Sequence, residues 1–200
     1  MSGKKIAFLD FDGTITTKDT LLEIIKFQKG NTSFYFGFLL HVHWLIAYKL
    51  NWLSNNLTKQ KILNYFFAGM EESVFQEKCD FFAENIIPGL VRPGALSEIT
   101  LLRARGFEIV VVSASAGNWI RKWTNNLSLQ LVATELEVKN GLITGKIKGK
   151  NNHGEQKAMN IRELWNLNEY EEIYAYGDSP GDRPMMDLAT KSFYKPFRTV

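Results

Sequence analysis

Three short apolar segments, each of which ends in polar side chains, constrain the fold of this chain most strongly. They cover residues 5–11, 107–112 and 172–176, and such runs are typical of buried strands in a parallel sheet. Helical patterns at residues 94–105 and 156–165 lie between them. Strands that alternate with helices predict an α/β protein, with a Rossmann-like three-layer α/β/α core around a mostly parallel sheet.

Two segments depart from this alternation. Residues 134–147 contain two strand patterns joined by Asn140-Gly141, which predicts a β-hairpin. Residues 17–86 contain no convincing strand pattern and predict several helices. We therefore expect a small α-helical cap at 17–86, inserted after the first strand of a catalytic core formed by residues 1–16 and 87–200.

Length, charge and cysteine content exclude several classes of protein. The 200 residues suit one domain with a small insert, and the net charge of +3 comes without the basic stripe expected of a nucleic-acid binder. The single cysteine, Cys79, excludes an internal disulfide framework. The first residues lack the pattern of a secretory signal, and no apolar run reaches the roughly 20 residues that span a bilayer. We expect a cytoplasmic protein, as a monomer or homodimer.

Acidic side chains follow two of the predicted strands. Asp10 and Asp12 come directly after the apolar residues 6–9 of the first strand, and Asp178 and Asp182 follow the strand at 172–176. The carboxyl ends of parallel strands share one edge of the sheet, so we expect these four groups to converge. Converging carboxylates favour a hard cation that oxygen ligands prefer, and Mg²⁺ is the expected cofactor.

Groups suited to anion binding occur between the two acidic pairs. Ser113 and Ala114 end the strand at 107–112, and Lys157 lies near the start of a predicted helix. A hydroxyl, free backbone N–H groups and an ammonium can bind phosphate oxygens. Each feature alone has an ordinary explanation as a turn, a helix cap or a solvated lysine. Their occurrence together, in this order, favours a functional site.

These residues resemble the four motifs of the haloacid dehalogenase superfamily. The resemblance rests on Asp10-x-Asp12-Gly13-Thr14, Ser113, Lys157 and Gly177-Asp178-x-x-x-Asp182. The insert at 17–86 is similar to the helical C1 cap of the phosphoserine-phosphatase-like subfamily IB. The resemblance implies a phosphatase (phosphoric monoester hydrolase) that acts through an aspartyl-phosphate intermediate.

The resemblance also implies a role for each motif residue. Asp10 would be the nucleophile and Asp12 the general acid and base, while Asp10, Asp12 (through its backbone carbonyl) and Asp178 would hold Mg²⁺. The groups implied in phosphate binding are Ser113, Ala114 and Lys157. The supporting groups would be Thr14 and Asp182.

The resemblance specifies the type of reaction more closely than it specifies the substrate. Asp19 stands where phosphoserine phosphatases typically carry a glutamate. No arginine occurs before Ile87, so Lys59 and Lys61 are the nearest substitutes for their cap arginine. A small phosphorylated metabolite, phosphoserine-like, is the first expectation. A lipid phosphate such as phosphatidylglycerophosphate, a non-catalytic module that binds a phosphorylated ligand, and a phosphotransferase are alternatives.

The aromatic segment at 34–52 has two interpretations. In the interpretation that we favour, it is an ordinary cap helix that packs on its neighbours. In the other it contacts a membrane surface, and the side chains suited to this are Trp44, Tyr48, Lys49 and Trp52.

Overall fold

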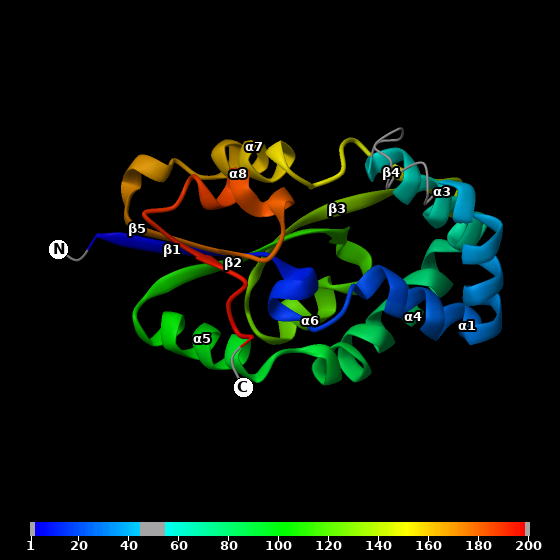
Figure 1. Ribbon diagram of the computed structural model, residues 1–200, viewed down its shortest axis with the longest axis horizontal. Helices are drawn as coiled ribbons and strands as arrows, with labels where there is room; N and C mark the ends of the chain where they lie inside the picture. The colour runs from blue at the N-terminus through cyan, green and yellow to red at the C-terminus, as the bar shows by residue number, and fades with distance from the viewer. Residues whose placement is uncertain (1–2, 45–54, 199–200) are drawn as a thin grey trace.

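The computed structural model describes residues 3–44 and 55–198. Its centre is a six-stranded sheet with the order β4-β3-β2-β1-β5-β6 (Figure 1). The strands are β1 (Lys4–Leu9), β2 (Phe107–Ala116), β3 (Gln130–Lys139), β4 (Leu142–Lys148), β5 (Tyr170–Gly177) and β6 (Lys191–Tyr194). All neighbouring strands are parallel except β3 and β4, which pair antiparallel. The predicted α/β fold with a mostly parallel sheet is confirmed.

Strand β1 lies in the middle of the sheet and is buried on both faces. Ile6 and Phe8 pack into one apolar cluster, whereas Ala7 and Leu9 pack into the other, and all four are 0 % exposed. Helices α5 (Pro93–Ala104) and α6 (Arg121–Asn126) lie on one side of the sheet, and α7 (Glu155–Leu164) and α8 (Arg183–Met186) lie on the other (Figure 1). This explains why the central strands β1 and β2 carry continuous apolar runs, since both faces of the sheet are covered there.

The hairpin of β3 and β4 has the predicted turn. Asn140 and Gly141 have φ angles of +51° and +74°. A two-residue turn of this kind requires positive φ at both positions, which asparagine and glycine tolerate best.

Three helices gather at one end of the molecule (Figure 1): α1 (Thr20–Leu40), α3 (Asn55–Phe67) and α4 (Glu72–Asn85). A non-helical Gly30, with φ +78°, interrupts α1. Helix α3 lies against β4, where Asn64 Nδ2 donates to Thr144 O at 3.0 Å. Residues 17–44 and 55–86 contain helices and no strand, as the sequence predicted. Within the described part of the chain, no helix has both the length and the apolar character needed to cross a bilayer.

Short helical turns occupy the connections. They are η1 (Phe11–Ile15), η2 (Ile87–Leu90), η3 (Gly117–Trp119), η4 (Leu167–Glu169) and η5 (Pro180–Asp182). Strand β2 continues beyond residue 112 to Ala116, which pairs with Thr134 of β3 after a shift in register that follows Ser113. It is followed by η3 and α6. Helix α8 begins at Arg183, and Pro184 occupies its first turn.

Candidate active site

The turn after β1 brings two strand ends together. Asp10 N donates to Tyr176 O of β5 at 2.9 Å. Gly13 has φ +82°, and a Cβ atom there would lie 2.5 Å from Asp178 Oδ2. Only glycine accepts both this backbone conformation and this close approach, so the Asp-Gly turn closes against the loop after β5.

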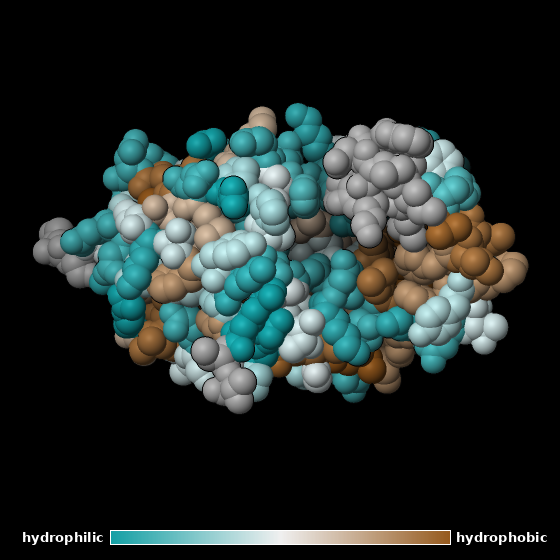
Figure 2. Space-filling view, viewed as in Figure 1, coloured by the Kyte–Doolittle hydropathy of each residue, from teal (hydrophilic) through white to brown (hydrophobic). Residues whose placement is uncertain are grey.

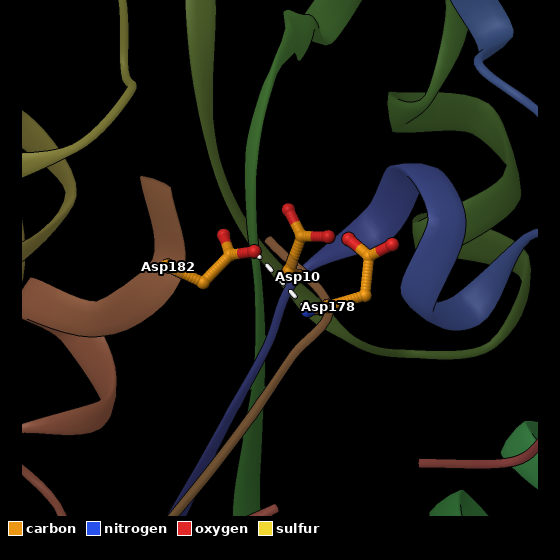
Figure 3. A group of neighbouring side chains, drawn as sticks. All are labelled: Asp10, Asp178 and Asp182. Atoms are coloured by element: carbon orange, nitrogen blue, oxygen red, sulfur yellow. Dashed lines mark hydrogen bonds between the residues drawn. The ribbon is translucent and has the colours of Figure 1, made fainter. Parts of the chain in front are cut away.

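Three of the four predicted acidic side chains form one cluster. Oxygen atoms of Asp10, Asp178 and Asp182 lie within 4.8 Å of one another, and Figure 3 shows the three carboxylates side by side, with Asp10 between the other two. Asp182 Oδ2 accepts from the backbone N of Asp178 at 3.2 Å and from Ser179 Oγ at 2.7 Å. The fourth, Asp12, is turned toward α1, where its Oδ1 accepts from Thr20 N at 2.7 Å.

Lys157, in the first turn of α7, links two of these carboxylates. Its Nζ donates to Asp10 Oδ1 at 2.5 Å and to Asp182 Oδ1 at 2.7 Å, and the residue is 1 % exposed. The other oxygen of Asp10 accepts from Thr14 Oγ1 at 2.8 Å. Asp10 is therefore held in one orientation from both sides.

Burial and charge together set the protonation of this cluster. Burial raises the pKa of Asp10 to about 7, although Lys157 acts in the opposite direction. Burial alone would lower the pKa of Lys157, but Asp10 and Asp182 outweigh it and raise that pKa. The pKa of Asp182 is lowered, because Lys157 and Ser179 outweigh the effect of burial. The lysine therefore stays charged in the interior.

The cluster fits a divalent cation. When ionised, its three carboxylates carry three negative charges, which the positive charges of Lys157 and Arg198 balance only in part. Burial and the charge of Asp182 raise the pKa of Asp178, while Arg198 lowers it. Oxygen ligands with this excess of negative charge are those that Mg²⁺ prefers.

The end of β2 forms the opposite wall of the site. Ala114 and Ser115 line the cavity. Ser113 is 0 % exposed, and its Oγ accepts from Ser115 N at 3.0 Å. Asn152 Nδ2 donates to the carbonyls of Ser113 and Val132, each at 3.0 Å, and so fixes β2 and β3 relative to each other at this edge.

These elements enclose a cavity of about 460 Å³. Besides the catalytic candidates it is lined by His153 and by side chains from α1, α3 and their flanks: Asp19, Leu21, Leu22, Phe38, Thr58, Lys59 and Ile62. One wall is therefore apolar, whereas Asp19 and Lys59 supply opposite charges.

The two charged cap candidates already have partners. Asp19 Oδ1 accepts from Leu21 N at 2.9 Å and so caps α1, and burial raises the pKa of Asp19 to about 6. Lys59 Nζ donates to Ala114 O at 2.5 Å, and burial lowers the pKa of Lys59 to about 8. Lys59 thus connects α3 to the end of β2.

The structure adds residues that the sequence did not single out. Arg198 Nη2 donates to Asp178 Oδ2 at 2.7 Å, and Ser115 and Asn152 shape the wall at β2. The one sequence feature that could have pointed to Asn152 is its position in the loop before Lys157. Tyr48, Lys49 and Trp52, named above for a membrane contact, lie outside the described residues.

The sequence profile of the haloacid dehalogenase-like hydrolases matches residues 7–187. The chain belongs to this family. The resemblance drawn from the motifs is thereby confirmed.

Individual relatives agree with this assignment. The protein CicA of Caulobacter vibrioides is 31 % identical over 96 % of this chain and 86 % of its own length. A probable phosphatase of Mycobacterium tuberculosis is 28 % identical over 90 % of this chain and 65 % of its own. A solved phosphoserine phosphatase, studied as an analogue of its phospho-aspartyl intermediate, shares the fold with a TM-score of 0.69 at 22 % identity, covering 96 % of this chain and 86 % of that one.

Proposed function

We propose that this hydrolase is a Mg²⁺-dependent phosphatase of phosphate monoesters that acts through an aspartyl-phosphate on Asp10. One observation carries the proposal: a buried aspartate at a strand end is held between Lys157 and Thr14, and it faces the cavity. A carboxylate fixed in one orientation can attack phosphorus without first having to reorganise. The phosphatases among its relatives agree with this chemistry.

The other residues have complementary roles in this proposal. Asp12 lines the same cavity and would protonate the leaving alcohol and then take a proton from the hydrolytic water. Lys157 and the N–H group at Ala114 would bind the phosphate oxygens, on which negative charge is concentrated in the transition state. Ser113 would support this wall. Its hydroxyl accepts from Ser115 N and so orients the turn.

The cation would be held by Asp10, Asp178 and the backbone carbonyl of Asp12, with Asp182 orienting Lys157. When bound, Mg²⁺ would offset the repulsion between the carboxylates and the phosphate. Asp182 keeps the ammonium of Lys157 charged, so this positive group remains available to the substrate.

We propose that residues 17–86 act as the cap, with the catalytic core at 1–16 and 87–200. Helices α1 and α3 supply most of the cavity wall outside the catalytic cluster, including Leu22, Phe38 and Lys59. The core presents groups suited to phosphate alone. Selection of the rest of the substrate therefore falls to the cap.

The substrate we propose is a small phosphorylated metabolite that resembles phosphoserine. Asp19 would receive a cationic group and Lys59 an anionic one, because both face the cavity with opposite charges. A lysine binds a carboxylate less specifically than an arginine does, so related phosphoamino acids belong in the same test.

The direct test measures phosphate release from p-nitrophenyl phosphate and phosphoserine, with Mg²⁺ and with EDTA. We expect turnover that requires Mg²⁺ and is lost in Asp10→Asn, with the unfolding temperature of that variant within a few degrees of wild type. Lys59→Met should raise KM for phosphoserine and leave KM for p-nitrophenyl phosphate nearly unchanged. Normal turnover in Asp10→Asn contradicts the proposal, and phosphate-ester binding without any turnover supports the non-catalytic alternative.

A further inference from the structure

The second half of α1 carries apolar side chains on every side. Phe34 and Phe38 turn inward and pack against each other, with ring centroids 4.6 Å apart. The outward side chains and their exposed fractions are Tyr35 (67 %), Phe36 (57 %), Leu39 (68 %) and Leu40 (47 %). A helix that is apolar all round is normally buried. Its outer face here, which we call the α1 patch (Tyr35, Phe36, Leu39 and Leu40), is open to solvent.

The α1 patch is continuous rather than scattered. Figure 2 shows apolar residues gathered at the end of the molecule where α1 lies. Val42, just beyond the helix, is 44 % exposed, and Tyr65 of the neighbouring α3 is 43 % exposed. A contiguous apolar surface of this kind marks an interaction site.

The chain around the α1 patch is entirely free of acidic residues. Between positions 26 and 70 the sequence has five lysines and no aspartate or glutamate. Three of these lysines lie over aromatic rings. Lys26 Nζ lies 5.0 Å from the ring centre of Phe34, Lys29 Nζ 5.8 Å from that of Phe67 and Lys61 Nζ 5.1 Å from that of Trp44. Lys26 also pairs with Glu23 at 2.8 Å. Lys59 faces the catalytic cavity instead, so the exposed aromatic and aliphatic groups are accompanied by the positive charges of Lys29 and Lys61.

We propose that the α1 patch docks onto an anionic lipid surface. Aromatic and aliphatic side chains that enter the headgroup boundary, together with surrounding lysines that attract anionic lipids, are the chemistry of an interfacial helix. A second copy of this chain is the competing occupant. Because a symmetric dimer through the α1 patch would bring two positively charged regions together, the charge favours lipid over self-association.

The α1 patch lies close to the catalytic cavity. Phe38 packs beneath the α1 patch and also lines the cavity. Docking would therefore hold the catalytic cavity next to the lipid surface. The inference goes beyond the proposed phosphatase activity, since lipid binding requires no turnover and can be measured in its absence.

Vesicle sedimentation tests the proposal with the full chain. The probes are phosphatidylcholine vesicles with and without about 30 % phosphatidylglycerol, at low and raised salt. The double variant Phe36→Ser/Leu39→Ser removes two exposed side chains of the α1 patch. Its matched control, Leu101→Ser/Leu164→Ser, removes exposed leucines of α5 and α7 (50 % and 60 % exposed).

We expect wild type and the control to bind the anionic vesicles, with weaker binding in raised salt and to neutral vesicles. The Phe36/Leu39 variant should lose about tenfold in partitioning, since two apolar side chains no longer enter the interface. Its hydrolysis of p-nitrophenyl phosphate should equal that of wild type, which shows that the fold is intact.

Three results would overturn the proposal. These are no binding to anionic vesicles, equal binding by wild type and the Phe36/Leu39 variant, and equal binding to neutral and anionic vesicles. A concentration-dependent dimer that the Phe36/Leu39 variant abolishes, without vesicle binding, would assign the α1 patch to self-association instead. If the vesicles bind but no phosphate ester is hydrolysed, the docking stands and the proposed function fails.

Discussion

Lys157→Met is expected to destabilise the metal-free protein and to abolish turnover, while increasing the effect of Mg²⁺ on stability. The side chain of Lys157 is 2 % exposed, and its Nζ contacts Asp10 and Asp182, whose side chains are 8 % and 3 % exposed. Methionine keeps the length and removes the charge, which leaves two buried carboxylates without their cation. Breaking one side of a buried ion pair costs about 3–5 kcal/mol, or about 10 °C in the unfolding temperature of a chain of this size.

The loss of stability in Lys157→Met should also depend on pH. Asp10 of wild type already has a pKa raised to about 7 by burial, and removal of Lys157 raises it further. Below pH 7 the variant can therefore relieve the buried charge by taking up a proton. The loss of stability should be larger at pH 8 than at pH 5.5.

Thermal unfolding at both pH values, with EDTA and with Mg²⁺, measures these effects. Mg²⁺ should raise the unfolding temperature of Lys157→Met more than that of wild type, because the cation replaces the missing positive charge. Lys150→Met, at an exposed lysine, is the matched control and should stay within about 0.5 kcal/mol of wild type. A Lys157→Met protein as stable as this control, or one with normal turnover, refutes the reasoning.

Three further predictions follow from the same cluster. Asp12→Asn should lower kcat/KM for alkyl phosphates by about 10²–10⁴-fold, with a smaller loss in kcat/KM for p-nitrophenyl phosphate, whose leaving group needs no proton; steady-state kinetics with both substrates compares them. In wild type, the rise in unfolding temperature on adding Mg²⁺ should be larger at pH 8 than at pH 5.5, because the pKa of Asp10 is raised from 3.8 to about 7 and a bound proton competes with the cation below pH 7; calorimetry at the two pH values decides this. Gly13→Ala should weaken Mg²⁺ binding in titration calorimetry and lower the unfolding temperature, since its Cβ would meet Asp178 at φ +82°; unchanged affinity would contradict the close approach.

Sequence predicted the centre of the fold and of the site because both depend on local patterns. The strand of apolar residues before Asp10 and the one before Asp178 each place an acid at a carboxyl end, and parallel pairing then brings the two ends together. The turn at Asn140-Gly141 could also be predicted, since its positive φ angles depend on the backbone preferences of two adjacent residues.

The rest of the site depends on contacts between distant segments. Arg198 reaches Asp178 from 20 residues away, and Asn152 joins β2 to β3 through backbone carbonyls, for which sequence carries no pattern. For the same reason the predicted strand at 107–112 ended too early, since β2 extends to Ala116. The pairing of Ala116 with Thr134 of β3 extends the strand past the shift in register after Ser113, although the serines and glycine there favour a turn.

Covalent labelling of Asp10 tests the central claim most directly. The Asp12→Asn variant, mixed with p-nitrophenyl phosphate and Mg²⁺ and quenched in acid, should release a burst of about one nitrophenolate per site, because attack by Asp10 proceeds while hydrolysis of the intermediate is slowed. Mass spectrometry should then find one phosphoryl group on the peptide that contains Asp10, and hydroxylamine should remove it. Turnover with no covalent phosphoryl group, or a phosphoryl group on another residue, would contradict the account.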